Sequence, residues 1–569
     1  MGILLPMMAA FEVPSQVVFN GIVTGMTYGV LAVGLVLVYR STRVINFAYG
    51  QMGVFGAALL ALLVINYHVN FYLALLLVLV VGGVLGAVIE LVVVRRLFKA
   101  PRVIMFVATL GVTQLFLLFQ FLLPTLDHYE PFPTPLTNTW EIGGIFVRGV
   151  HVMVIVIVPV LTVALALFLK HSKFGTAVRA AADNPDAARS SAINIKTVST
   201  VVWILAGLLA TITAVLVAPL RGSTAAATAE LGPSLILRAL AAALVGRMRS
   251  MPLALLGGVG IGLVEALMFY NATDDPGRID AILFVVVLVA VLAMSRSTRE
   301  DEGSKSMSFS PRVKPIPAAL QRYWVVRRLS VVGILSVGAV GLLIPVVFTR
   351  VVTQYTFSLM LLYAIVALSL TLLTGWAGQL SLGQFAFVGL GAILSSALVR
   401  GMTFDVFGEH IQLPHITLEG AVVIAVVVSA LVAMVVGTPA LRVRGLFLAV
   451  TTLAFAVMAQ SWLLGRPFLL GDQSIVQLDR PGWLRDQKTY YYVCLVAVIL
   501  VAVMLGRIRR SGIGRSLVAI RDNEQGAAAF TISPTRMKLM AFGVAGALAG
   551  LAGGLFAGSS AFAPLSSAA

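Results

Sequence analysis

Long uninterrupted runs of apolar residues recur along almost the whole 569-residue chain. Many approach or exceed the roughly 18 residues with which an α-helix spans a bilayer. These runs are apolar on all sides, whereas the strands of a membrane β-barrel alternate over about 10 residues. We therefore predict an all-α, polytopic transmembrane helical bundle. Clear examples are residues 17–38, 71–94, 151–169, 421–436 and 491–505.

The composition excludes a water-soluble globular fold. Hydrophobic residues make up 59% of the chain and charged residues 11%, whereas soluble domains carry about 25% charged residues. The 52 glycines suit closely packed membrane helices. The net charge of +17 would suggest nucleic acid in a soluble protein, but membrane proteins collect positive charge in cytoplasmic loops. We therefore expect the lipid bilayer of the cell membrane, and no nucleic acid, as a partner.

One segment, residues 295–328, interrupts the hydrophobic pattern. It is polar and basic, contains Ser and Pro, and has no run long enough to span a membrane. We interpret it as a cytoplasmic linker between a first half at residues 1–294 and a second half at residues 329–569.

Basic residues collect in alternate loops, which the positive-inside rule places in the cytoplasm. The first half then crosses nine times from an N-terminus outside and the second seven times, giving about 16 membrane segments. The short segment at residues 234–244 has the alternative of being re-entrant. The predicted crossings of the second half are residues 331–347, 357–373, 380–399, 421–436, 446–464, 491–505 and 539–557. The basic clusters are Arg40/Arg43, residues 95–102 and 170–196, Arg247/Arg249, the linker, Arg442/Arg444 and residues 507–521.

Two stretches of the first half recur in the second. Residues 34–57 match residues 367–390 at an offset of 333, and residues 174–195 match residues 513–534 at an offset of 339. Nearly equal offsets indicate a duplication. The matched pairs include Gly50-Gln51 with Gly383-Gln384, Phe47 with Leu380, Asp183-Asn184 with Asp522-Asn523, Ala188 with Ala527 and Ile193 with Ile532.

The second repeated stretch is a long polar loop on the basic side. Its first copy, residues 170–199, carries five Lys or Arg residues against two Asp. The Ala-rich centre predicts short helices separated at Asp183-Asn184, and Asn184-Pro185 suits a turn followed by a helix N-terminus. A single such loop could be merely solvated. Two copies, one in each half, indicate a docking surface for a paired cytoplasmic partner.

At these residues the chain resembles the permeases of ABC importers. The stretch at residues 179–198 is similar to their cytoplasmic coupling loop. More narrowly, the two halves resemble the two different permease subunits of the branched-chain amino acid uptake system, which would here be fused. The matching segments are residues 44–57 and 243–267 in the first half and residues 373–392, 442–456 and 514–534 in the second.

The resemblance implies an importer for branched-chain or related amino acids. Two permease halves would form one translocation path, two separate cytoplasmic ATPase subunits would dock on the coupling loops, and an extracytoplasmic solute-binding protein would deliver substrate. The chain has no Walker A pattern, so we expect a transport component rather than an enzyme, with no cofactor of its own and with ATP used by partner subunits. The implied coupling residues are Ala181, Ala182, Asp183, Asn184, Pro185, Ala188, Ile520, Arg521, Asp522, Asn523, Glu524 and Ala527.

Polar side chains near the start of the second crossing of the first half, and at the matching place in the second, are candidates for the translocation path. They can line a path, or they can join helices by hydrogen bonds. An intramembrane carboxylate is a functional candidate by default, although Glu265 could equally serve helix packing. For Glu90, an ion pair with Arg95 or Arg96 is the better interpretation. The path candidates are Asn46, Gln51, Gln379, Ser381, Gln384 and Glu265.

Two alternatives stand beside the importer. Repeated halves also suit a secondary, ion-coupled transporter. The second half stops soon after residue 557, whereas about 80 residues follow the corresponding helix of the first half. We therefore expect a C-terminally truncated second permease, or final helices supplied by another chain, and an incomplete non-transporting fragment is the third possibility. The six His residues show no metal-ligand spacing, so we expect no metal site.

Overall fold

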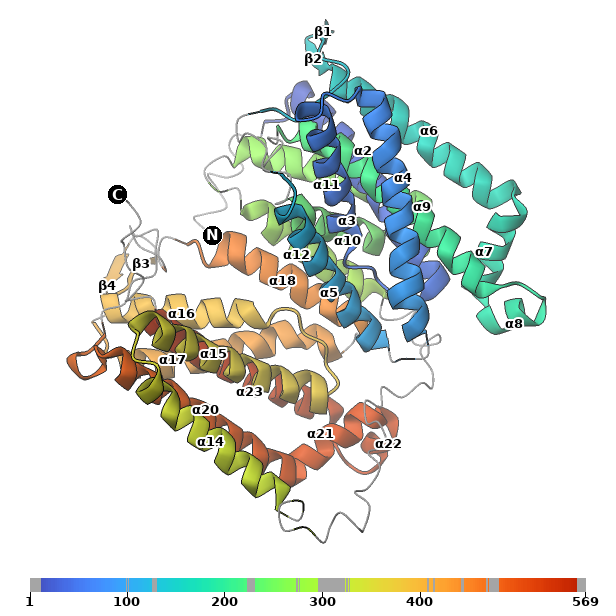
Figure 1. Cartoon of the computed structure of the whole chain (residues 1–569). Helices are drawn as coiled ribbons and strands as arrows, with labels where there is room; N and C mark the ends of the chain where they lie inside the picture. The colour runs from blue at the N-terminus through green and yellow to red at the C-terminus, as the bar shows by residue number, and fades with distance from the viewer. Residues whose placement is uncertain are drawn as a thin grey trace. The chain divides into compact units, whose positions relative to one another are not determined.

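The computed structural model divides the chain into two compact units, Met1–Arg296 and Ser297–Ala569 (Figure 1). Among the described residues, eleven helices are long and apolar enough to cross a membrane, and four shorter helices are also apolar. This confirms the polytopic all-α fold. Most of the predicted linker, together with Arg442 and Arg444, lies outside the described residues. These are residues 12–98, 100, 102–124, 130–222, 231–272, 275, 277–294, 323, 326, 328–406, 409–412, 415–441, 445–466, 469 and 480–559.

The first unit is a bundle of long helices with one hairpin and one pair of short helices. Helix α4 ends in a π-helical turn, η1 (Glu90–Val94), and a 3₁₀ turn, η2 (Arg95–Leu97). The hairpin joins β1 (Thr139–Ile142) to β2 (Ile145–Arg148). The helices are α2 (Ser15–Thr42), α3 (Tyr49–Ile65), α4 (Phe71–Ile89), α5 (Arg102–Phe121), α6 (Gly149–His171), α7 (Lys173–Asp183), α8 (Pro185–Ser190), α9 (Ile195–Leu220), α10 (Leu231–Val245), α11 (Met251–Asn271) and α12 (Arg278–Met294).

Helix α2 is buried along most of its length and is the centre of the first unit. Gly21, Gly25 and Gly29 recur every fourth residue on α2 and face Gly258 and Gly262 of α11. A Cβ atom at Gly25 would lie 2.6 Å from a backbone carbon of α11. Small residues at such spacing let two membrane helices approach closely. The glycines therefore set the distance between α2 and α11.

The second unit contains the second copy of this plan. Two of its helices end in π-helical turns, η5 (Thr371–Trp376) after α15 and η7 (Ala459–Leu463) after α18. Its hairpin joins β3 (Thr403–Val406) to β4 (Glu409–Gln412). The helices are α14 (Leu329–Val347), α15 (Val351–Leu370), α16 (Gln384–Arg400), α17 (Leu418–Gly437), α18 (Leu446–Met458), α20 (Gln487–Arg510), α21 (Gly512–Asp522), α22 (Glu524–Ala529) and α23 (Pro534–Ser559), with 3₁₀ turns η6 (Thr438–Leu441) and η8 (Gly482–Leu484).

Helix α23 is the centre of the second unit and packs against α15, α16 and α17. Its C-terminal end is held by Arg480, whose Nε donates to the carbonyl of Gly558 at 2.6 Å. The same guanidinium donates to Gln487 at 3.0 Å and lies 3.8 Å from the centre of the Tyr490 ring. A cation at the last carbonyls of a helix satisfies groups that have no partner within the helix. Arg480 thereby joins the end of α23 to the start of α20.

One predicted crossing is wrong at its start. The crossing expected at residues 380–399 begins at Gln384, because residues 377–383 are not helical. The first half has the same interruption between α2 and α3, at residues 43–48. The short segment expected at residues 234–244 lies within α10, a helix of 15 residues.

Replacing Gly25 by Ala should destabilise the first unit. The added methyl group would meet the backbone of α11, and overpacking of this kind costs about 1–3 kcal/mol. The matched control is Gly260→Ala on α11, where an added Cβ would have no neighbour within 4 Å. Thermal unfolding of the purified protein in detergent should give a lower midpoint for Gly25→Ala and an unchanged or higher one for Gly260→Ala. Equal midpoints would show that the close approach does not constrain the fold.

Candidate functional site

The first candidate site is the pair of short helices α7 and α8 between the long helices α6 and α9. The Ser172 hydroxyl accepts a hydrogen bond from the amide of Gly175 at 2.8 Å and begins α7. The Asn184 side chain accepts from the amide of Ala187 at 3.1 Å and begins α8. These side chains satisfy amides that lack partners in the first turn. The break therefore falls at Asp183-Asn184, as the sequence predicts.

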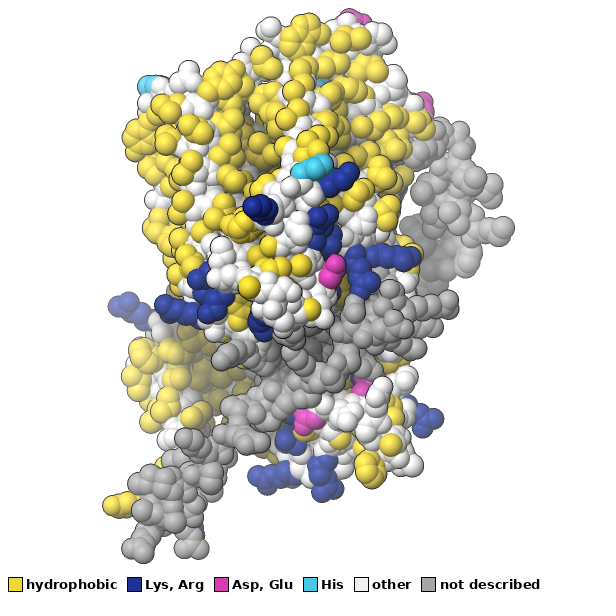
Figure 2. All heavy atoms as spheres, turned by 90° about the vertical axis from the view of Figure 1, so that its right-hand side faces the viewer, with side chains coloured by type: hydrophobic (Ala, Val, Ile, Leu, Met, Phe, Trp, Pro, Cys, Tyr) yellow, Lys and Arg dark blue, Asp and Glu magenta, His cyan; other side chains and the backbone are white. Residues whose placement is uncertain are grey.

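Helix α7 is amphipathic. Val178, Ala181 and Ala182 are buried against the bundle, while Asp183 and Asn184 at its end are exposed. Figure 2 shows Lys and Arg side chains gathered below the hydrophobic surface of this face, on the side where α7 and α8 lie. One face of the pair is thus anchored in the membrane unit and the other is polar and accessible.

The second unit contains the same arrangement in α21 and α22, between α20 and α23. Asn523 begins α22 by accepting a hydrogen bond from the amide of Gly526 at 2.9 Å. Leu517 and Ile520 are buried on the inner face. Glu524, the first residue of α22, forms an ion pair with the buried Lys538 of α23 at 3.0 Å. This ion pair joins the short helices directly to the central helix of the unit.

The two copies agree in the details of their backbones. Ala192 and Thr531 occupy equivalent positions and both have a positive φ, 60° and 62°, which is uncommon for residues other than glycine. In each copy the next amide donates to the alanine carbonyl five residues earlier, Ile193 to Ala188 at 3.0 Å and Ile532 to Ala527 at 3.3 Å. The sequence repeat is therefore also a repeat of structure.

The exposed surfaces of the two copies differ. Phe530, at the end of the second copy, is 80% exposed. Ser191 stands at the equivalent position of the first copy. An aromatic side chain with this exposure is unusual outside a contact surface, and aromatic residues are enriched in protein interfaces. Phe530 ends the predicted coupling segment at residues 520–530, but the sequence analysis did not single it out, although a phenylalanine inside a polar loop would have indicated it.

The second candidate site is the interruption between α2 and α3. Residues 44–48 are buried although they are not helical. The Asn46 side chain accepts a hydrogen bond from the amide of Ala48 at 3.0 Å, and Gln51 donates to Gln120 of α5 at 2.9 Å. The Nδ2 atom of Asn46 and the Oε1 atom of Gln51 have no hydrogen-bond partner within the described residues. The structure thus places both path candidates at a buried, partly unsatisfied interruption.

The equivalent interruption of the second unit, residues 377–383, contains Gln379 and Ser381, and Gln384 is the first residue of the helix that follows it, α16. Gln384 donates to the hydroxyl of Ser369 and to the carbonyl of Ala545, both at 2.9 Å. Ser381 accepts from the amide of Gly383 at 3.3 Å, and Gln379 donates to a neighbouring carbonyl at 3.2 Å. Gln384 therefore bridges three helices, while Gln379 and Ser381 support the non-helical backbone itself.

Glu265 lies in a cluster of buried and partly buried charges in the first unit. Arg238 of α10 donates to both carboxylate oxygens of Glu265, with Nε to Oε2 at 2.9 Å. Arg221, just after α9, donates to the same carboxylate at 3.0 Å and to the hydroxyl of Tyr28 at 2.6 Å. Asp280 of α12 lies 3.8 Å from Arg238. The cluster thus links α2, α10, α11, α12 and the residue that follows α9.

The sequence analysis missed both arginines of this cluster. Arg238 is a lone charge inside the apolar run of α10, and such a residue needs a partner. Elsewhere in the unit, the ion pair expected for Glu90 is confirmed, because Arg95 lies 3.0 Å from its carboxylate. Thr200 of α9 also donates to Glu90 at 2.9 Å. This contact joins the end of α4 to the helix that follows the short pair.

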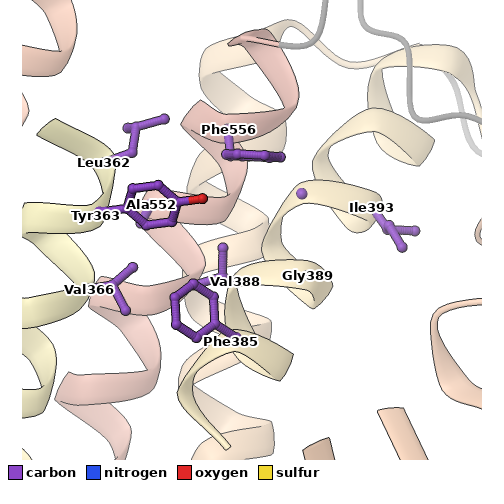
Figure 3. A pocket seen from close by; sticks show the side chains of 10 residues that line it. Leu362, Tyr363, Val366, Phe385, Val388, Gly389, Ile393, Ala552 and Phe556 are labelled. Carbon is purple, nitrogen blue, oxygen red and sulfur yellow. The ribbon is translucent and has the colours of Figure 1, made fainter. Parts of the chain in front are cut away.

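An apolar cavity of about 240 Å³ lies in the second unit between α15, α16 and α23. Figure 3 shows Tyr363 extending from α15 toward Phe556, with Phe385 and Val388 of α16 beneath. The walls offer aliphatic and aromatic contacts, and the Tyr363 hydroxyl is the polar atom drawn among the lining side chains. The cavity can hold an apolar group but offers no acid–base pair. In the part that the structure describes, no group of three His, Cys, Asp or Glu residues could hold a metal ion.

The family follows from comparison with known proteins. The model of the family described as "Branched-chain amino acid transport system / permease component" matches residues 17–292 and, separately, residues 352–569. The chain belongs to this permease family. Each match lies within one of the two structural units, so the chain is a fused double permease.

Curated relatives agree with this assignment. The chain is 27% identical over 279 residues to the probable branched-chain amino acid transport permease protein LivH of Methanocaldococcus jannaschii, covering 47% of this chain and 85% of the relative. It is 25% identical over 299 residues to LivH of Escherichia coli K12, covering 49% and 93%. It is 30% identical over 225 residues to LivM of Salmonella typhimurium, covering 35% and 50%. The chain therefore spans half the length of that LivM relative.

In this permease, Glu265→Gln should destabilise the first unit. The amide keeps the size of the side chain but leaves the buried Arg238 and the partly buried Arg221 without their main counter-charge. Breaking a buried ion pair costs about 3–5 kcal/mol. The matched control is Glu141→Gln, an exposed residue of the β1–β2 hairpin. The thermal midpoint in detergent should fall for Glu265→Gln and stay unchanged for Glu141→Gln. An unaltered midpoint in both would mean that the cluster does not stabilise the fold.

Proposed function

We propose that this chain is the membrane-spanning component of an ATP-driven ABC importer for branched-chain or related amino acids. The observation that carries the proposal is the pair of matching short-helix elements, α7–α8 and α21–α22. Two related permease units, residues 1–294 and 329–569, are joined by a linker at residues 295–328 and form one translocation path. The relatives named as branched-chain amino acid permeases support the choice of substrate class.

The short helices are docking sites for two separate ATPase subunits. Their inner faces are anchored in the bundle, and their ends are exposed and polar. Each pair of short helices also connects two long helices, so a displacement of the pair moves the ends of those long helices directly. Of the twelve residues implied by the sequence, Asp183, Asn184, Asp522, Asn523 and Glu524 lie at the accessible ends. The guanidinium of Arg521 binds the carbonyl of Gly375 within the unit. The buried members Ala181, Ala182, Ala188, Ile520 and Ala527 anchor the short helices in the bundle.

The side that carries the short helices is cytoplasmic. Lys170, Lys173, Arg179 and Arg189 of the first unit and the basic end of α20 in the second support this orientation through the positive-inside rule. One long helix, α6, separates the first hairpin from α7, and three, α17, α18 and α20, separate the second hairpin from α21. Both numbers of crossings are odd, so both hairpins face outside. A solute-binding protein delivers substrate to that outer face in the cell membrane.

The translocation path runs beside the two interruptions. Discontinuous helices in transporters expose backbone groups that can bind solutes near the middle of the bilayer. Asn46, Gln51, Gln379, Ser381 and Gln384 supply polar groups at or next to these places, and Glu265 adds a partly buried charge. The chain binds no cofactor in this scheme, and its partners use ATP.

The interruptions also favour a second candidate, a secondary transporter, because discontinuous helices are common in that class. A secondary transporter would have no use for two matched docking loops. Purification from native membranes distinguishes the two, since the importer co-purifies with ATPase subunits. Uptake driven by an ion gradient in their absence supports the secondary transporter.

Reversing one charge in each loop, with Asp183→Arg and Asp522→Arg together, should uncouple transport. Both carboxylates lie at the break between the short helices, where an arginine would reverse the local charge and change the turn. We expect uptake into proteoliposomes, and the stimulation of ATP hydrolysis, to fall about tenfold or more. Glu141→Arg on the outer hairpin is the control. Normal transport by the double variant would contradict the coupling-loop assignment.

Removing the exposed aromatic side chain with Phe530→Ala should weaken docking on the second unit. A central aromatic residue of an interface often contributes about 2 kcal/mol or more, close to thirtyfold in affinity. The control is Tyr67→Ala, an exposed aromatic residue in the loop between α3 and α4. Affinity for the ATPase subunits, measured by biolayer interferometry in nanodiscs, should fall only for Phe530→Ala. A loss of similar size in both variants would argue against docking at Phe530.

A further inference from the structure

In the first unit one arginine joins the interruption to the short helices. Arg43 directly follows α2 and is the first residue of the interruption, with a φ of 56°. Its Nη2 atom donates to the carbonyl of Ala182, in the last turn of α7, at 3.0 Å. Carbonyls in the last turn of a helix have no partner within the helix. Arg43 therefore caps α7 from the interruption.

In the second unit an arginine makes a similar connection in the opposite direction. Arg521 belongs to α21, and its Nη1 atom donates to the carbonyl of Gly375 at 2.6 Å. Gly375 lies in η5, directly before the interruption at residues 377–383. Asp522 holds the same guanidinium through Nε at 2.9 Å. Arg521 therefore caps the helix before the interruption from α21.

The two contacts join equivalent positions of the repeat. The offset of 339 places Ala182 on Arg521, and the offset of 333 places Thr42, the neighbour of Arg43, on Gly375. The same junction is thus made twice, with the arginine on opposite sides. The guanidinium comes from the interruption in one unit and from the short helix in the other. The two units therefore share a hydrogen bond between these two elements rather than a conserved arginine position.

The surrounding side chains are exchanged in the same way. A Cβ atom at Gly378, whose φ is +67°, would lie 2.7 Å from Cγ of Arg521. The repeat places Ile45 on Gly378 and the small Ala182 on Arg521. One unit therefore has a small residue on the short helix and a large one in the interruption, and the other unit has the reverse. In the second unit the small Gly378 leaves room for the arginine of the short helix, and in the first unit Ala182 is the small residue on the short helix while the arginine comes from the interruption.

We infer that Arg43 and Arg521 are positioning residues that carry movements of the ATPase-docked helices into the two interruptions. Asn46 follows Arg43 by three residues, and Gln379 follows Gly375 by four, so little chain separates each connection from the polar groups of the path. The inference rests on the proposed function. It assigns to these arginines transmission of movement rather than docking.

The test compares Arg43→Asn and Arg521→Gln, singly and together. Asn tolerates the positive φ of position 43, and Gln keeps a long polar side chain within α21. The matched controls are Arg179→Gln on α7 and Arg515→Gln on α21, which replace exposed arginines of the two short helices. Each full-length protein is reconstituted in liposomes with the ATPase subunits and the solute-binding protein. ATPase binding, ATP hydrolysis and leucine uptake are then measured.

We expect both single variants to bind the ATPases within twofold of the unaltered protein, while leucine uptake falls about tenfold and the controls keep theirs. Normal uptake in both single variants would overturn the inference, and so would loss of ATPase binding together with a lowered thermal midpoint, which indicates a merely structural role. Failure of the unaltered protein to bind ATPases would instead overturn the proposed function.

A further variant tests whether uptake depends on the hydrogen bond between the short helix and the interruption rather than on an arginine at position 43. The triple variant Arg43→Asn, Ile45→Gly, Ala182→Arg gives the first unit the arrangement of the second. We expect it to recover uptake to within about threefold of the unaltered protein. A second readout does not depend on this repacking: thiol labelling of Ser381→Cys, since the natural Cys494 is buried. With Arg521 intact, an ATP analogue should change the rate at which the introduced thiol is labelled. With Arg521→Gln the analogue should not change it, and an equal change in both proteins would overturn the inference.

Discussion

Backbone polar groups inside a bilayer have no water to bind, and this constraint governs the whole molecule. Non-helical backbone is tolerated at that depth only where protein surrounds it. Residues 43–48 and 377–383 break their helices and are mostly buried, so the rest of each unit must enclose them. In the first unit α5 packs on the interruption, where the ring of Phe106 contacts that of Phe47 and the Thr109 hydroxyl accepts from the Phe47 amide. In the second, Thr452 of α18 accepts from the amide of Leu382, and Arg521 of α21 packs against Gly378. These helices therefore enclose backbone that has no helical hydrogen bonds of its own.

The same lack of water requires partners for buried charges. Glu265 holds Arg221 and Arg238, Glu90 holds Arg95, and Lys538 holds Glu524. The last pair joins α23 to the short helix α22. Glu90 and Arg95 both lie at the end of α4, and both form hydrogen bonds with Thr200 of α9. Ion pairs thus stabilise the bundle near the short helices and around Glu265, and close glycine contacts stabilise the packing of α2 on α11.

The sequence predicts local features of this protein better than its long-range contacts. Asn184-Pro185 and Asn523 punctuate the polar loops, so the break between the short helices is visible in the residues themselves. The start of α16 is not, because residues 380–383 continue an apolar run and their non-helical backbone depends on enclosure. The partners of Arg238 and Arg43 lie 27 and 139 residues away. Only the folded structure brings those groups together.

The duplication has preserved a geometry while its chemistry has diverged. The turns at Ala192 and Thr531 are alike, yet the second copy has Phe530 where the first has Ser191. The arginine of the junction belongs to the interruption in the first unit and to the short helix in the second. A partner that docks on the first loop meets a polar surface, and one that docks on the second meets an aromatic ring. The two loops therefore keep one backbone geometry while they offer different surfaces to any protein that docks on them.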